Sequence, residues 1–179
     1  MQYVSHYQSP LGEILLAADE IGLTGVWFEN QRYYAHQLEK PYIEADIPIF
    51  EQAKQWLDIY FSGCEPRLQI PFHLEGTDFQ QEVWKILSEI PYGQTITYGE
   101  IARKLAKQRG IERMAAQAVG SAVGHNSIAI IVPCHRVVGT NGSLTGYAGG
   151  LDKKIRLLEL EKIDMTKLFV PQKGTIKKP

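Results

Sequence analysis

Cysteine is scarce in this chain of 179 residues, and the two that occur, Cys64 and Cys134, lie far apart. Their spacing fits neither a disulfide framework nor the paired cysteines of zinc and redox motifs. The five histidines are scattered as well, so we expect no metal site and no cofactor. Unpaired cysteines are typical of a reducing compartment, and we therefore expect a cytoplasmic protein.

Long apolar runs are also missing. No run approaches the roughly 20 apolar residues that a membrane helix needs. Met1–Tyr3 leads straight into a strand-like pattern, without the basic and apolar segments of a signal peptide. Hydrophobic residues make up 44% of the chain and charged residues 22%, which is ordinary for a globular protein. We expect one or two small domains and no membrane partner.

The net charge of −1 hides a strong asymmetry. Residues 1–76 carry four Lys or Arg against eleven Asp or Glu, whereas residues 77–179 carry fifteen against nine. A basic half indicates an anionic partner, and nucleic acid is the usual one. Halves of a chain also differ in charge without any function, so this signal needs support from motifs.

The first 76 residues predict an α+β domain built on an antiparallel sheet. Alternating apolar residues indicate strands at Tyr3–Tyr7, Glu13–Ala18 and Leu23–Phe28, separated by turns. A helical stripe that includes Phe50, Leu57 and Tyr60 follows, and Gly63 is a suitable residue to end that helix. Leu68–Leu74 is extended and a candidate to join the sheet. No functional site is visible in this half.

Residues 77–163 predict a second, mainly helical domain. Thr77 and Gln80 form a capping box, and the helix that they begin ends before Pro91–Gly93. Further helices are expected at Tyr98–Ala106 and Glu112–Val123, an arrangement that suggests a helix-turn-helix. A last helix is expected at Leu151–Leu160. The lysine-containing remainder, residues 164–179, is expected to be a flexible basic tail.

The predicted helix Glu112–Val123 carries almost no long side chains, although a helix that reads base edges normally presents Arg, Asn or Gln. Small residues allow the backbone to come very close to a surface, which suits a shallow groove and contacts to phosphates. Close packing against another helix uses small residues equally well, and the sequence leaves both explanations open.

A reactive cysteine is suggested by residues 131–138, which read IVPCHRVV. Cys134 precedes His135 inside an apolar, β-branched run, which predicts a buried strand or strand-like segment. Thiol chemistry proceeds through the thiolate, and a neighbouring base lowers the cost of forming it. A buried structural cysteine is the alternative that the adjacent pair alone does not exclude.

The segment Pro133–Arg136 resembles the active-site signature of the O6-alkylguanine-DNA alkyltransferases, also called methylated-DNA–protein-cysteine methyltransferases. The resemblance runs from Thr77 to Ile163 and is weak over the first 76 residues. The other matching elements are Ile96–Tyr98, Ala118–Gly120, Asn126, Gly146–Leu151 and Glu161. It implies a ribonuclease H-like first domain and a winged helix-turn-helix-like second domain.

The resemblance also implies a function, DNA repair by direct transfer. An alkyl group would move irreversibly from guanine O6 to Cys134, once per molecule, and thymine O4 is a further candidate source. His135 would accept the thiol proton through a water, and Glu161 would orient His135. Tyr98 would protonate the departing guanine, and Asn126 would join the backbones of the DNA-binding helix and the cysteine segment.

The implied partner is double-stranded DNA that contains an alkylated guanine, and we expect a monomer to act on it. The target base must leave the stack, at a cost of a few kcal/mol. The residues expected to contact DNA are Ala115, Ala116, Gln117, Gly120 and Arg136. Those expected to form the base pocket are Tyr98, Val137, Tyr147, Ala148 and Gly149. The carbonyls of Cys134 and Val137 are candidate acceptors for the amino groups of guanine.

Two positions depart from the family pattern. Gln117 stands where many members place an arginine that fills the gap left by the flipped base, and Arg113 is a candidate to compensate. Ala148 stands where some members carry a serine close to O6, so backbone N–H groups would have to make that contact. Neither change affects Cys134.

Three other functions remain open at this stage. A non-catalytic protein that binds alkylated DNA is the main alternative, although such relatives replace the cysteine. A helix-turn-helix regulator and a cysteine hydrolase are the others. All three predict that alkylated DNA leaves Cys134 unmodified.

Overall fold

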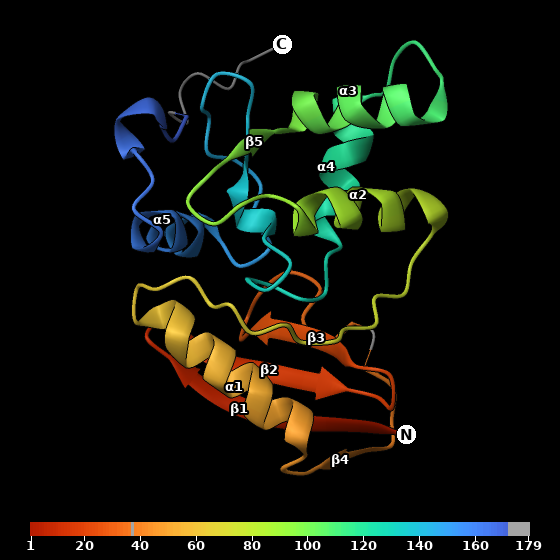
Figure 1. Ribbon diagram of the computed structural model, residues 1–179, viewed down its shortest axis with the longest axis vertical. Coiled ribbons are helices and arrows are strands. Elements are labelled where there is room, and N and C mark those ends of the chain that lie inside the picture. Colours follow the sequence, from red (N-terminus) through yellow and green to blue (C-terminus); the bar gives the residue numbers. More distant parts are fainter. Residues whose placement is uncertain (37, 172–179) are drawn as a thin grey trace.

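The computed structural model describes residues 1–36 and 38–171, and Figure 1 shows them as two stacked parts. A sheet covered by one helix forms the lower part, and a group of shorter helices forms the upper part. One continuous apolar core runs through both, since Phe28 and Leu57 from the lower part belong to the same buried cluster as Val132 and Leu157 from the upper part. The two parts therefore form one packed unit.

The sheet contains the three predicted strands and one that the sequence did not reveal. β1 (Gln2–Ser9), β2 (Gly12–Ala18) and β3 (Leu23–Phe28) form an antiparallel meander, as expected. β4 (Tyr42–Glu44) adds to β1 in parallel, which gives the order β3-β2-β1-β4. The prediction of a purely antiparallel sheet is wrong at this edge, because all three residues of β4 are exposed and show no apolar alternation.

The helix α1 (Pro48–Phe61) packs on this sheet through the predicted stripe. It ends before Gly63, whose φ of 90° lies in the left-handed region that glycine adopts without strain. The segment Leu68–Leu74 does not form a strand of its own and touches the sheet through a single bridge between Leu23 and Phe72.

The free edge of β3 holds a segment of the upper part. Val26 donates its N–H to the Ser127 carbonyl at 2.8 Å, and Ala129 donates to the Val26 carbonyl at 3.0 Å. The Ser127 hydroxyl adds a hydrogen bond of 2.9 Å to the Thr24 carbonyl. These bonds fix the backbone just upstream of Cys134, so the first domain takes part in building the site.

The upper part begins with α2 (Asp78–Ser88), whose predicted capping box at Thr77 is present. It continues through β5 (Ile96–Thr97), α3 (Tyr98–Arg109), α4 (Ala116–Gly124), β6 (Val137–Val138) and α5 (Leu151–Leu160). The helices α2, α3 and α4 pack together, which confirms the helix-turn-helix-like arrangement, and β5 pairs with β6 in parallel. In the described part of the chain, no helix combines the length and hydropathy needed to cross a bilayer.

Two boundaries differ from the prediction. α4 begins at Ala116 rather than near Glu112, because Ala115 has extended backbone angles and offers no capping side chain. The expected flexible tail is ordered as far as Pro171: η2 (Met165–Lys167) forms, Leu144 donates to the Phe169 carbonyl at 2.7 Å, and Phe169 donates to Gly142. Residues 172–179, the rest of that predicted tail, lie outside the described residues.

Candidate active site

Cys134 lies at the start of a short 3-10 helix, η1 (Cys134–Arg136), and not in a strand as predicted. The chain turns sharply at this point, since the Cys134 N–H donates to the Val132 carbonyl at 2.8 Å. The extended segment is limited to Val137–Val138. The apolar, β-branched residues around Cys134 correctly indicated a buried segment, since Cys134 is only 7% exposed, but they did not indicate its backbone conformation.

Asn126 follows α4 and holds the turn that leads to the cysteine. Its amide nitrogen donates to the carbonyls of Val132 at 2.8 Å and Ile128 at 3.3 Å, and its oxygen accepts from the Ile128 N–H at 3.0 Å. The side chain therefore connects the end of α4 to the backbone just before Cys134, in the bridging position that the sequence suggested.

Glu161 is the centre of a buried polar network behind Cys134. Its Oε2 accepts from His135 Nε2 at 2.6 Å, and its Oε1 accepts from Arg136 Nε at 2.8 Å and from the Gly93 N–H at 2.9 Å. Burial by itself raises the pKa of this carboxyl, but the hydrogen bonds and charges of His135 and Arg136 outweigh burial and lower the pKa to about 2. Glu161 is thus ionised at neutral pH.

Arg136, which was expected to contact DNA, belongs to this buried network. The residue is 7% exposed, and its guanidinium donates to both Glu161 oxygens and to the Ile90 carbonyl at 2.7 Å. It also lies over the Tyr92 ring, 5.6 Å from its centre. Pairing the planar guanidinium with one carboxylate compensates for burying both charges, because either charge alone would be costly to remove from water.

His135 is completely buried, and burial lowers its pKa, while the bond to Glu161 acts in the opposite direction. An ionised carboxylate at 2.6 Å requires the proton of the neutral ring to be on Nε2. Nδ1 is then the basic nitrogen, and among the described residues it has no hydrogen-bond partner. No hydrogen bond joins the ring to the Cys134 thiol within that part of the chain, so a proton would pass between them through water.

Lys154 is a buried cation that no sequence pattern indicated. It is 0% exposed, and its Nζ donates to the carbonyls of Val137 at 2.6 Å and Thr145 at 3.1 Å. Burial lowers its pKa to about 8, and the charge of Cys134 opposes this shift. Burial likewise raises the pKa of the Cys134 thiol, while the Asn126 side chain and the Lys154 charge favour the thiolate.

A cavity of about 670 Å³, here called the front cavity, is connected to Lys154 through Thr145, which lines the cavity and accepts a hydrogen bond from Lys154. The predicted pocket residues Tyr98, Tyr147 and Ala148 line it. The pKa values of both tyrosines are raised, mainly by burial and then by the charge of Cys134, so the sulfur lies near both rings. Gly149 lies behind Tyr147, where a Cβ would come within 2.8 Å of that ring.

Val137, also predicted for the pocket, is buried in β6, and its carbonyl already accepts from Lys154. The N-terminal domain supplies two residues of the front cavity, Arg32 and Tyr33, which sequence reasoning missed. They lie in the loop after β3, and the Arg32 N–H donates to the Ala148 carbonyl at 2.9 Å. The Tyr33 ring stacks on His125 at the end of α4, with 4.3 Å between ring centres.

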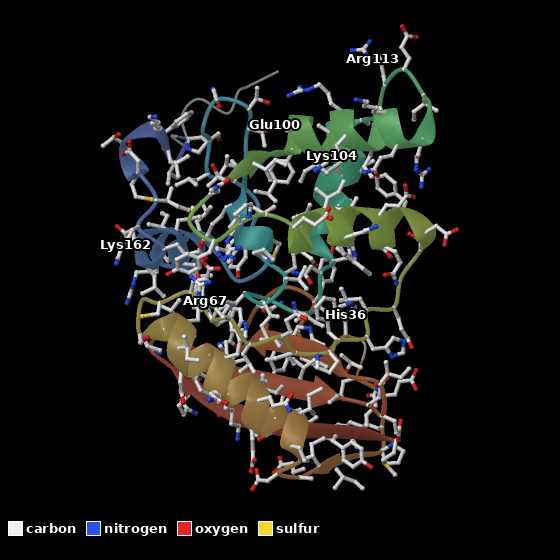
Figure 2. The ribbon with its side chains drawn as sticks, viewed as in Figure 1. His36, Arg67, Glu100, Lys104, Arg113 and Lys162 are labelled. Carbon is white, nitrogen blue, oxygen red and sulfur yellow. The ribbon has the colours of Figure 1, made fainter. Side chains whose placement is uncertain are left out.

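The outer face of α4 forms one wall of the front cavity with small residues. Those lining it are Ala116, Gln117, Gly120, Ser121 and Gly124, and Ala115 is exposed at the start of the helix. The opposite face buries Val119, Ala122 and Val123. Small side chains on the exposed face are therefore not required for helix packing. Arg113 is exposed at the outer tip of the connection between α3 and α4 and does not line the front cavity (Figure 2).

Two family models match this chain. The one described as 6-O-methylguanine DNA methyltransferase, ribonuclease-like domain, covers residues 2–74. The one described as 6-O-methylguanine DNA methyltransferase, DNA binding domain, covers residues 78–163. The chain belongs to the 6-O-methylguanine DNA methyltransferase family.

Individual relatives agree with this assignment. The chain is 47% identical over 161 residues to a methylated-DNA–protein-cysteine methyltransferase of Methanosarcina acetivorans, which covers 89% of this chain and 97% of the relative. The corresponding protein of Haemophilus influenzae is 41% identical, with 90% and 87% covered. Among solved structures, the Mycobacterium tuberculosis OGT in complex with DNA superimposes with a TM-score of 0.77 at 43% identity, covering 93% of this chain and 94% of that one.

In this member of the methyltransferase family, the tertiary structure brings most of the predicted site residues together. Cys134 directly precedes His135, which is hydrogen-bonded to Glu161, and Tyr98 lines the front cavity, where its hydroxyl donates to the Gly146 carbonyl at 3.3 Å. Arg136, which was expected to contact DNA, is buried in the Glu161 network. The residues that were missed, such as Lys154, look in the sequence like ordinary surface or core positions.

Proposed function

We propose that this protein repairs DNA by transferring an alkyl group from guanine O6 to Cys134, once per molecule. The observation that carries the proposal is a buried thiol whose neighbours suit this reaction. His135, the next residue, is neutral and bonded to an ionised Glu161, and the charge of Cys134 acts on Tyr98 and Tyr147, which line a cavity large enough for a base. The likeness to methylated-DNA–protein-cysteine methyltransferases supports the same reaction.

The transfer step forms one bond and breaks one. The Cys134 proton passes through water to Nδ1 of His135, and the sulfur attacks the carbon attached to O6. The bond between sulfur and carbon forms while the bond between carbon and O6 breaks, and its electron pair stays on guanine. The Tyr98 hydroxyl gives guanine a proton and regains one from solvent. The protein keeps a thioether, a poor leaving group, so the reaction is stoichiometric.

Glu161 stabilises the imidazolium that forms on His135, because the carboxylate is already charged and bonded to Nε2. Its partner Arg136 keeps the carboxylate ionised and so prevents it from taking the proton itself. Lys154 lowers the cost of the thiolate by its charge. The network thus lets a thiol with a raised pKa react at neutral pH.

The DNA would lie along the exposed face of α4, where short side chains allow the backbone to approach a groove. A flipped base would enter the front cavity between Tyr98 and Tyr147, close to the sulfur. We further propose that the protein acts as a cytoplasmic monomer, since a single-use reaction requires no symmetry. The division into residues 1–76 and 77–163 is also our proposal, and the family models at 2–74 and 78–163 support it.

Intact mass measurement tests the proposal directly. The protein is incubated with duplex DNA carrying one O6-methylguanine, and the modified peptide is mapped. We expect a gain of one methyl group on Cys134, saturating at one per protein, and none in Cys134→Ala. The matched control is Cys64→Ala, which removes the exposed cysteine and should react fully.

Two other results would overturn it. Tight retention of the methylated DNA without any gain in mass would mean a lesion-binding protein. Neither mass gain nor preference for the lesion would exclude both functions. A duplex with O4-methylthymine, run in parallel, tests whether that base is also a substrate.

A further inference from the structure

Tyr60 is the residue of the N-terminal domain that reaches the buried network. It lies in the last turn of α1, and its side chain is completely buried. Its hydroxyl donates to Glu161 Oε2 at 2.6 Å and lies 3.4 Å from Nε2 of His135. In the sequence, Tyr60 is one apolar position among others on a helical stripe, and nothing there connects it to Glu161, 101 residues later.

We propose that Tyr60 is a positioning residue for the reaction, whose hydroxyl holds the Glu161 carboxylate against His135 and keeps the imidazole proton on Nε2. This inference rests on the proposed function for its catalytic consequence. It assigns the N-terminal domain a part in the chemistry, beyond supporting the fold.

The directions of the hydrogen bonds carry the argument. Burial raises the pKa of the Tyr60 phenol, and the charge of Glu161 raises it further, so the phenol stays protonated. Its one proton points to the carboxylate at 2.6 Å, which leaves an oxygen lone pair toward Nε2 of His135. That arrangement suits an N–H on Nε2 and disfavours a bare nitrogen there. Nδ1 is thereby kept free as the base.

The Tyr60 ring is held independently of its hydroxyl. Trp56 stacks on it with 5.5 Å between ring centres and an angle of 7°, and Phe61 and Tyr92 pack edge-on. A phenylalanine at this position therefore keeps the ring in place. Tyr60→Phe removes the hydroxyl and its hydrogen bond from the network and keeps the ring, so it leaves a gap no larger than one oxygen atom.

The other charged groups that face His135 come from the C-terminal domain. They are Glu161 and Lys154 at α5, and Arg136 in η1, while the neighbouring Cys134 is a neutral but titratable thiol. Without the hydroxyl, the Glu161 carboxylate loses one donor, and more of its charge acts on His135. We therefore expect the pKa of His135 to rise in Tyr60→Phe. His135 is then protonated at a higher pH, so the neutral imidazole that acts as the base disappears earlier as the pH falls.

The test compares Tyr60→Phe with Tyr7→Phe. The Tyr7 hydroxyl also donates to a carboxylate on α1, Asp58, at 2.6 Å, so the control loses the same kind of bond to the same helix away from the site. The single-turnover rate of methyl transfer is measured against pH for both variants. In parallel, the nitrogen shifts of His135 are followed by NMR in protein without DNA.

The expected result is a shift of the acid limb to higher pH by about half a unit in Tyr60→Phe alone, equal to a rate about threefold lower on that limb. The His135 titration should move in the same direction. Unchanged profiles, or equal shifts in both variants, would overturn the inference and leave the hydroxyl a structural role. If the wild type transfers no methyl group, the proposed function fails, but the His135 titration still decides whether Tyr60 positions the ring.

Discussion

The two sides of Cys134 are built on opposite principles. Behind the sulfur, each oxygen of Glu161 accepts at least two hydrogen bonds, and the side chains of Tyr60, His135 and Arg136 that donate to it are almost fully buried. In front, the wall formed by α4 carries short side chains and one glutamine, and no charged residue of that helix lines the cavity. One side is a fixed charged network, and the other is an open and nearly uncharged surface.

The contrast teaches where this protein is sensitive to change. Charges in a dry environment interact strongly and tolerate the loss of a partner poorly. Contacts to a DNA backbone form at a solvent-exposed surface, where salt screens them, and they are shared among many residues. Substitutions behind the sulfur should therefore act strongly on folding and chemistry, and substitutions in front should act mildly on binding.

The largest effect is expected for Glu161→Gln. The change leaves the buried Arg136 guanidinium without its counter-charge, so the free energy of unfolding should fall by about 3 kcal/mol or more. Urea unfolding measures this loss. Glu159→Gln, an exposed position two residues earlier on α5, is the control and should stay within about 0.5 kcal/mol of wild type. Similar values for the two variants would show that the network does not support the fold.

Acid should weaken the same network in a defined range. The pKa of Glu161 is lowered from 4.5 to about 2 in the folded protein, so between these values the unfolded chain binds more protons. The contribution to stability is complete above about pH 4.5 and is lost as the pH falls toward 2. At pH 3.5, wild type should have lost about 1 kcal/mol from this group.

The measurement is the difference in unfolding free energy between wild type and Glu161→Gln at pH 7 and at pH 3.5. The glutamine variant lacks the titrating group, so the difference should be smaller at the lower pH. A constant difference would mean that the carboxyl is not held ionised by its partners.

An intermediate effect is expected for Lys154→Met, which removes the buried charge and keeps much of the side-chain volume. The thiolate of Cys134 then loses a stabilising cation, so the rate of methyl transfer at pH 7 should fall about tenfold and its rise with pH should move upward. Lys153→Met is the matched control, because Lys153 lies over the Phe28 ring instead. Equal rates for the two variants would remove Lys154 from the mechanism.

The smallest effect is expected in front, for Gln117→Arg. An arginine on the exposed face of α4 adds one charge next to the expected DNA path and should tighten binding a few-fold. The slope of log affinity against log salt should become steeper by about one. The stoichiometry of transfer should stay at one. A large change in the transfer rate without a change in affinity would contradict this expectation, because it would mean that position 117 acts on the transfer step and not on DNA binding.

Much of the fold could be predicted because its signals are local. The capping box at Thr77, the strand Leu23–Phe28 and the helix Leu151–Leu160 all appear as expected. β4 was missed because its three residues are all exposed and show no alternation of apolar and polar side chains. It forms only by pairing with β1, which lies far away in the sequence. The strand predicted around Cys134 proved to be η1, because apolar residues report burial more reliably than they report backbone geometry.

The site was predicted less completely. Cys134 and His135 stand out by their chemistry, and Glu161 was selected through the family resemblance alone. Arg136 was expected to contact DNA, and nothing local in the sequence indicated its bond to Glu161, which lies 25 residues later in the chain. The sequence contained no signal for Tyr60, whose partner is still more remote.

What the sequence by itself determined is the set of reactive groups and the local elements that carry them. Capping, helical periodicity and the Cys-His pair each depend on residues a few positions apart. Only the tertiary structure decided which state these groups adopt, that is, which carboxylate is charged, which nitrogen of His135 is free and which arginine is buried. Those properties arise from burial and from charges that the two domains bring together. Burial and the proximity of charges both depend on position in space and not on separation along the chain.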